Sequence, residues 1–114
     1  MSDRIRKLAS LIRQDPTDPF PRYALALEVL KTGDLETSRR LFESVRELDN
    51  VYPGLAYQLG VLYHRLGRLD AARQRLEEGL REAERTHDDH TRRELLTVLL
   101  QVEADADAGG IGFP

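Results

Sequence analysis

The sequence contains two copies of one repeat, since segment 19–52 aligns without a gap on segment 53–86. The length of this repeat limits the possible folds more than any other feature of the sequence. The two segments share seven identical residues. The identical pairs are Pro19/Pro53, Tyr23/Tyr57, Leu25/Leu59, Gly33/Gly67, Leu35/Leu69, Arg39/Arg73 and Glu43/Glu77. A repeat of this length is typical of proteins that stack helical hairpins, in which each unit buries its apolar face against its neighbours.

Each unit is predicted to contain two helices. Pro19 and Pro53 suit the first position of a helix, where the missing N–H needs no partner, and Asp18 is a candidate N-cap. Apolar residues then recur at helical spacing. Gly33 and Gly67 follow, and glycine supplies the left-handed conformation that ends many helices. A second helix is expected to begin two residues after each of these glycines.

The amino-terminal flank follows the same register. A shift by one repeat period places Leu8 on Phe42 and Leu11 on Val45. Residues 3–15 are therefore predicted to form the second helix of an incomplete repeat.

The carboxy-terminal flank contains one more apolar stripe. We predict a last helix over about 90–106, capped by Asp88 or Asp89, after a connection near 84–89 that is longer than the period requires. Its apolar residues either pack on the last repeat or form a homodimer contact; they are Leu95, Leu96, Leu99, Leu100 and Val102. The expected segments are an amino-terminal helix 1–18, units 19–52 and 53–86, a capping helix 87–107 and a disordered tail 108–114.

The second unit resembles the tetratricopeptide repeat family in its sequence pattern. The matching positions are Leu59, Gly60, Tyr63, Gly67, Ala72 and Leu76, and the first unit has Leu25, Ala26, Val29, Gly33, Ser38 and Phe42 there. Arg22 and Ala56 replace the usual Trp, and Gly79 replaces a usual Ala. The resemblance implies an all-α fold, a right-handed superhelix of antiparallel helix pairs with about six helices. It also implies a non-enzymatic scaffold or adaptor that binds another protein.

The first helix of each unit has a second apolar face beside its packing stripe. By the family resemblance, this face lines a concave groove in which a partner peptide or helix binds. The candidate groove residues are Tyr23, Leu27, Leu30, Lys31, Tyr57, Gln58, Val61, His64 and Arg65. They would suit an apolar segment with acidic character. Two alternatives stay open: the chain's own terminal helices cover these residues, or a second copy does, which would give a weak homodimer in place of a monomer.

Other functional classes find little support. The net charge is −3 and the arginines are interleaved with acidic residues, which disfavours nucleic-acid binding. The chain has no cysteine, so disulfides and thiolate metal sites are excluded. We recognise neither a secretory signal nor an apolar run long enough for a membrane span, so we expect a cytoplasmic protein.

Catalytic and metal-binding patterns are also weak. His87 and His90, with two aspartates between them, could share a helix face as metal ligands, but the rest of the chain offers no convincing distant ligand. Ser38 occupies a small packing position, and Ser44 lies on a helix among Glu43 and Glu47. The carboxylates alternate with arginine at spacings typical of solvated helix surfaces. We therefore predict no enzyme activity, no cofactor and no metal.

Overall fold

The computed structural model describes residues 2–110, and within them the chain forms six α-helices and no strand. The predicted all-α helical repeat fold is confirmed. The chain divides into two compact units, Met1–Leu55 and Ala56–Pro114, which we describe separately. The helices are α1 (Asp3–Gln14), α2 (Pro19–Lys31), α3 (Leu35–Leu48), α4 (Leu55–Arg65), α5 (Leu69–Arg85) and α6 (Asp89–Gly110). No helix among these is long and apolar enough to cross a membrane.

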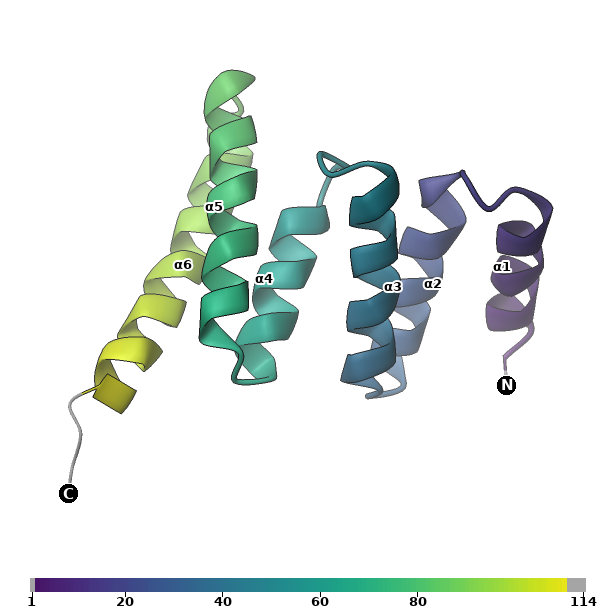
Figure 1. Cartoon of the computed structure of the whole chain (residues 1–114), viewed down its shortest axis with the longest axis horizontal. Coiled ribbons are helices and arrows are strands. Elements are labelled where there is room, and N and C mark those ends of the chain that lie inside the picture. The colour runs from purple at the N-terminus through teal and green to yellow at the C-terminus, as the bar shows by residue number, and fades with distance from the viewer. Residues whose placement is uncertain (1, 111–114) are drawn as a thin grey trace. The chain divides into compact units, whose positions relative to one another are not determined.

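In the first unit, α2 packs against α1 on one side and against α3 on another (Figure 1). The helix starts follow the local sequence signals. The carboxylate of Asp18 accepts a hydrogen bond from the Phe20 N–H at 3.0 Å, and Pro19 takes the first helical position, as predicted. Gly33 ends α2 with a φ of +86°, a left-handed conformation that favours glycine.

The first unit has a core between α1 and α2 and a second contact between α2 and α3. Leu8 of α1 packs with Ala24 and Leu25 of α2, and partly buried apolar residues surround them. At the second contact, the Ser38 hydroxyl donates a hydrogen bond of 2.8 Å to the Ala26 carbonyl oxygen. Ser38 is fully buried, so its small side chain both permits close helix packing and has its polar group satisfied.

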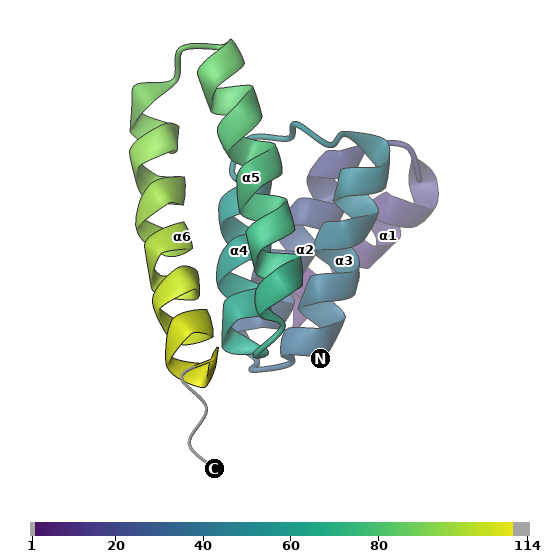
Figure 2. The same ribbon diagram turned by 60° about the vertical axis from the view of Figure 1, so that its left-hand side comes forward.

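In the second unit, α5 and α6 run antiparallel and lie side by side (Figure 2). Two glycines set the spacing around α5. A Cβ on Gly60 of α4 would collide with the Leu76 side chain, and a Cβ on Gly79 of α5 would collide with Ala56 and come within 2.9 Å of Leu95. Gly79 therefore has a packing role at the point where α4, α5 and α6 approach one another.

The start of α4 differs from the prediction. We expected Pro53 at its first helical position, but α4 begins at Leu55. Gly54 has a φ of +85°, which is incompatible with a right-handed helix, and Pro53 belongs to the turn before it. The Leu55 N–H bonds to the Tyr52 carbonyl at 3.1 Å and closes this turn.

The connection before α6 also differs from the prediction. Helix α5 has 17 residues against 14 in α3, so the chain extends the helix and connects it to α6 through only residues 86–88. The Asp88 carboxylate accepts a hydrogen bond from the Thr91 N–H at 3.1 Å, which confirms the predicted cap.

The end of α6 is later than expected. The helix continues to Gly110, so the prediction of a disordered tail is wrong for residues 108–110, and residues 111–114 lie outside the described part. Ala104, Ala106 and Ala108 have the highest helix propensity of any residue type, which offsets the weaker propensity of the intervening aspartates.

Candidate functional site

Helix α1 does not contact all of the α2 residues that we predicted to line the groove. The α2 residues in the cluster with α1 are Ala24, Leu25 and Val29. Leu27 and Leu30, the candidate groove residues, do not belong to this cluster and are half-buried. In the first unit, the side of α2 that binds α1 is therefore distinct from the side on which the predicted groove residues lie.

Tyr23 lies in an aromatic cluster. Its ring contacts Phe42 edge to face, with centroids 5.3 Å apart, and lies 4.9 Å from the ring of Tyr52. Its hydroxyl also fills the space beside Gly54, where a Cβ would stand 2.6 Å from the oxygen. Tyr23 thus anchors the segment between α3 and α4, a structural role that the repeat pattern did not reveal.

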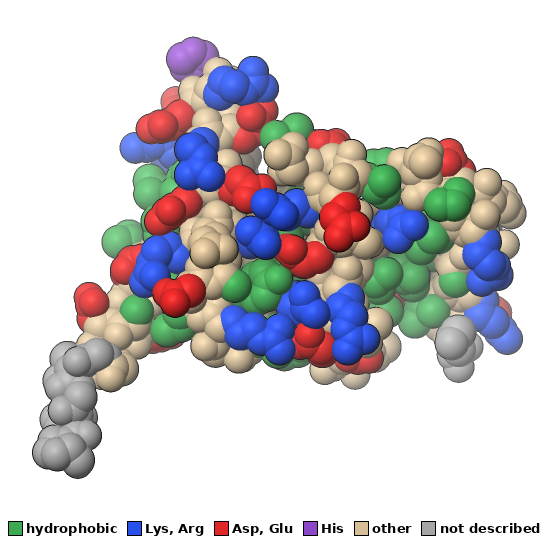
Figure 3. Space-filling view, in the orientation of Figure 1, with side chains coloured by type: hydrophobic (Ala, Val, Ile, Leu, Met, Phe, Trp, Pro, Cys, Tyr) green, Lys and Arg blue, Asp and Glu red, His purple; other side chains and the backbone are tan. Residues whose placement is uncertain are grey.

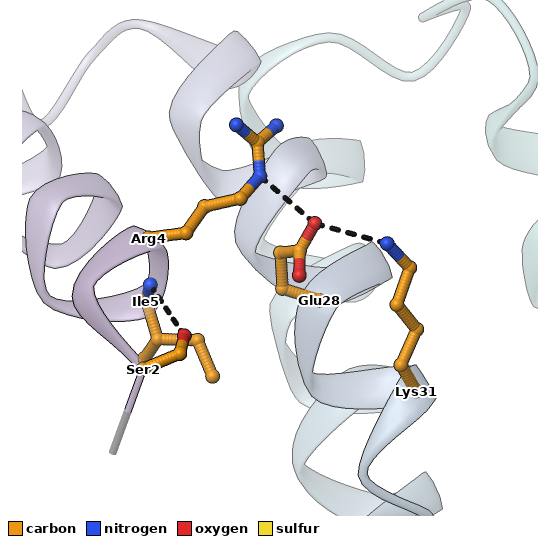
Figure 4. Close-up of polar contacts among 5 residues, drawn as sticks. All are labelled: Ser2, Arg4, Ile5, Glu28 and Lys31. Atoms are coloured by element: carbon orange, nitrogen blue, oxygen red, sulfur yellow. Dashed lines mark hydrogen bonds and ion pairs between the residues drawn. The ribbon is translucent and has the colours of Figure 1, made fainter.

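Lys31 stands at the last position of α2 and takes part in an ion-pair network (Figure 4). Its ammonium group and the Nε of Arg4 from α1 bind the same oxygen of Glu28, at 3.2 and 2.8 Å. Hydrogen bonds from Lys31 and Arg4 lower the pKa of Glu28 below its ordinary value. The Glu28 side chain is only 18% exposed, whereas the two cations remain largely in solvent.

On the corresponding face of α4, exposed residues stand at both ends and half-buried residues lie between them. Tyr57 is 39% exposed, although it occupies the same repeat position as Tyr23. Gln58 and Val61 are half-buried, and Arg65 is exposed at the last position of the helix.

The carboxy-terminal helix reaches this face at His64. The Nε2 of His64 is in close contact with a carboxylate oxygen of Asp105 from α6, and the His64 side chain is 24% exposed. Just before Asp105 in α6, Glu103 binds Arg73 of α5 through a 2.6 Å ion pair, which raises the pKa of Arg73. Helix α6 thus contacts both α4 and α5, and part of the predicted groove face of α4 has an intramolecular partner.

The apolar stripe of α6 serves mainly to pack the second unit. Leu95 and Val102 are buried, and Leu95 lies beside Gly79 of α5. The stripe therefore packs on the last repeat, one of the two alternatives that the sequence left open. Leu100 is the exception, since its side chain is 70% exposed.

The candidate metal ligands serve as helix-end residues. Asp88 caps α6, and its hydrogen bonds from Thr91 lower its pKa. His90 pairs with Glu94 at 3.5 Å along the same helix. Within residues 2–110, no group of three or more potential ligand side chains gathers in one place.

One exposed residue was missed by the sequence analysis. Phe20, in the first turn of α2, is 58% exposed. It precedes Leu27 by seven residues and Lys31 by eleven, so helical spacing places all three on one side of α2. That spacing could have identified it, but our comparison used paired repeat positions, and the counterpart of Phe20 is Gly54.

Charged side chains cover the second helices of both units. In the view of Figure 3, basic and acidic side chains are interspersed over α3 and over α5. Several form pairs one helical turn apart, such as Arg39 with Glu36 at 2.6 Å and Arg73 with Asp70 at 2.8 Å. Ion pairs one turn apart on a helix surface contribute little to stability.

Comparison with known proteins agrees with the architecture. Residues 29–89 match the sequence profile of the tetratricopeptide repeat. The chain is similar to the crystal structure of a tetratricopeptide repeat domain protein from Salinibacter ruber, with 40% identity over 75% of this chain and 97% of that one, and a TM-score of 0.69. A solution structure of a tetratricopeptide repeat domain protein from Salinibacter ruber gives 40% identity, coverage of 79% and 91%, and a TM-score of 0.71. No curated protein matches the sequence.

Proposed function

Because the chain belongs to the tetratricopeptide repeat family, whose domains are in general protein–protein interaction modules, we propose that it binds a peptide or helix of a partner protein through the candidate groove residues of α2 and α4. In this proposal the chain is a non-enzymatic adaptor in the cytoplasm. The repeat supplies the surface, and the partner supplies the segment that covers it.

The observation that carries the proposal is the exposure of Tyr57. Its ring is 39% exposed on a helix that is otherwise rich in buried apolar residues. Tyrosine combines a large apolar surface with a polar hydroxyl and loses little side-chain entropy on binding, so it is frequent among residues that dominate interface energetics. Val61, one helical turn away, extends the apolar surface beside it.

Charge favours a partner with acidic residues. Lys31 and Arg65 occupy the same repeat position and end α2 and α4 as exposed cations. The contact of His64 with Asp105 supports the same preference, because it is an example of a carboxylate bound on this face of α4. An acidic partner segment would meet complementary charge, which favours specificity and a fast association rate.

Substitution of the two groove faces tests the proposal. The partner is first captured from native cell lysate with the wild-type chain and identified by mass spectrometry. A double variant, Tyr57→Ala with Leu27→Ala, is expected to abolish capture of that partner while circular dichroism shows unchanged helical content. A matched variant, Val51→Ala with Leu100→Ala, removes two exposed apolar side chains elsewhere and is expected to retain capture. Full capture by the Tyr57 and Leu27 double variant would show that the groove is not the site.

A second candidate function is self-assembly, which the exposure of Leu100 favours. A large apolar side chain that is 70% exposed on a terminal helix suits a homodimer contact. Light scattering on the purified chain separates the two functions. A monomer supports the partner-binding proposal, whereas a dimer that Leu100→Ala dissociates supports assembly.

A further inference from the structure

We propose that the last turns of α6, residues 103–110, reversibly cover the candidate groove at His64, and that a carboxylate of the partner takes the place of Asp105 when the partner binds. We call these residues the α6 end; they form the yellow end of the helix in Figure 2. The inference rests on the function proposed above, because it concerns access to the same groove. It adds that the chain competes with its own partner for one position of α4.

The contact between His64 and Asp105 has the chemistry of a carboxylate-binding site. The imidazole Nε2 donates a hydrogen bond to one oxygen of Asp105, since an ionised carboxylate can only accept. The other oxygen accepts a long hydrogen bond, at 3.5 Å, from the side-chain amide of Gln101 one helical turn earlier. The Asp105 side chain is 47% exposed, so a carboxylate from outside can reach the same imidazole and exchange with it.

His64 lies on the side of α4 that carries the exposed tyrosine of the groove. Tyr57, Val61 and His64 follow one another at spacings of four and three, so they share one side of the helix. Tyr57 is 39% exposed near the start of this side, and Asp105 covers its other end at His64. A partner segment that binds Tyr57 and Val61 and continues along α4 therefore meets Asp105.

Packing holds the α6 end less firmly than the preceding part of the helix. Val102 is fully buried, whereas none of residues 103–109 is buried. Polar contacts join this segment to its neighbours: Glu103 pairs with Arg73 of α5 at 2.6 Å, and Asp105 contacts α4. Segments with few buried apolar contacts open locally at a low free-energy cost. The α6 end can therefore open while the rest of the unit stays folded.

Charge also weakens the α6 end. Asp107 lies in the last turn of α6 and Asp105 two residues earlier, and this turn has no basic residue. Carboxylates near the end of a helix meet the negative end of the helix dipole, which destabilises the last turns. The hydrogen bond from His64 offsets this effect at Asp105. Once a carboxylate of the partner accepts that hydrogen bond instead, the α6 end loses the compensation and opens.

Two matched synthetic peptides test the competition in the full chain. Both carry leucine at every third or fourth position, one with glutamate on the flanks and the other with lysine in its place. Asp105→Ala removes the competing carboxylate and is expected to bind the acidic peptide about threefold more tightly than wild type, with no gain for the basic peptide. Asp107→Ala makes the same change on the opposite side of α6 and should bind within about 1.5-fold of wild type. An equal gain for both peptides would contradict competition by a carboxylate.

Substitution of His64 separates competition from a purely structural contact. His64→Ala also breaks the contact with Asp105, but it removes the donor that the carboxylate of the partner would use. We therefore expect His64→Ala to bind the acidic peptide no more tightly than wild type, in contrast to Asp105→Ala. If the contact only held α6 in place, both variants would tighten binding equally, and that result would overturn the inference. Circular dichroism confirms that each variant is folded.

Hydrogen exchange on the wild-type chain measures the opening itself. Saturation with the acidic peptide is expected to raise the exchange rates of amides 103–108 about threefold and to leave those of α5 unchanged. Unchanged exchange at the α6 end, or equal affinity of wild type and Asp105→Ala for the acidic peptide, would overturn the competition. The groove proposal would survive this result if the peptide shifts the backbone NMR signal of Tyr57. An acidic peptide that shifts Tyr57 in neither chain would overturn the groove proposal and the competition with it.

Discussion

The two units place different side chains at equivalent positions of the repeat, and the consequence is clearest at their tyrosines. Tyr23 and Tyr57 are one repeat period apart. Tyr23 packs between the rings of Phe42 and Tyr52, whereas Tyr57 is 39% exposed. The position equivalent to Phe42 is Leu76, and Leu76 packs against Gly60. The unit that has an aromatic residue, Phe42, in its second helix has the packed tyrosine, and the unit that has Leu76 there has the exposed tyrosine.

The helix contacts themselves show the same contrast. In the first unit, Ala26 and Ser38 meet through a hydrogen bond, and aromatic rings fill the adjoining space. In the second unit, glycine at Gly60 and Gly79 permits a closer approach with aliphatic side chains. A repeat pattern thus specifies where helices touch, but the stability of each contact depends on the particular pair of side chains, and so does the surface left for binding.

The largest expected effect is the loss of Phe42. Its side chain is fully buried, so Phe42→Ala removes an aromatic ring from the core and leaves Tyr23 without its edge-to-face partner. We expect a loss of about 3–5 kcal/mol in the free energy of unfolding, measured with urea. Leu100→Ala, at a 70% exposed site, should change it by less than about 0.5 kcal/mol. A small effect at Phe42 would contradict its place at the centre of the first unit.

The contrast between the tyrosines is tested by the same substitution at both. Tyr23→Ala is expected to destabilise the chain by about 2–3 kcal/mol, because it removes two ring contacts and opens space beside Gly54. Tyr57→Ala should cost less than about 0.5 kcal/mol. Thermal and urea unfolding measure both. Equal losses would mean that Tyr57 also has a structural role and would weaken its assignment to partner binding.

The glycine contact of the second unit is expected to give an intermediate effect. Gly79→Ala improves helix propensity by about 1 kcal/mol, but its new methyl group collides with Ala56, whose short side chain has no room to move aside. We expect a net loss of about 1–2 kcal/mol, since overpacking typically exceeds the gain in propensity. Gly109→Ala lies in open space and is expected to leave stability unchanged or slightly raised. A stabilising Gly79→Ala would show that α4 and α5 separate easily.

The sequence predicted those features that depend on nearby residues. The cap at Asp18, the left-handed turn at Gly33 and the start of α5 two residues after Gly67 all follow from local backbone chemistry. The start of α4 was mispredicted because Pro53 suggested a first helical position. The positive φ of Gly54, which delays the start of the helix, is visible only in the structure.

The surface was less predictable because it depends on residues far apart in the chain. The packing of Gly60 depends on Leu76, and the environment of His64 depends on Asp105, 41 residues away. No periodicity in a single sequence specifies such pairs. The groove residues therefore stay a prediction as a set, with Tyr57 the best supported and Tyr23 the least.

The smallest expected effect concerns the charge that joins α1 to α2. The pKa of Glu28 is lowered in the folded chain by Lys31 and Arg4, so the ionised carboxylate contributes stability above the ordinary glutamate pKa of 4.5. This contribution decreases as the pH falls through the lowered folded-state pKa, because the protonated carboxyl no longer pairs with the cations. Glu28→Gln should therefore be slightly less stable than wild type at pH 7 and should approach it below about pH 4. Urea unfolding across this range measures the difference, and a gap that widens toward low pH would reverse the assigned sign.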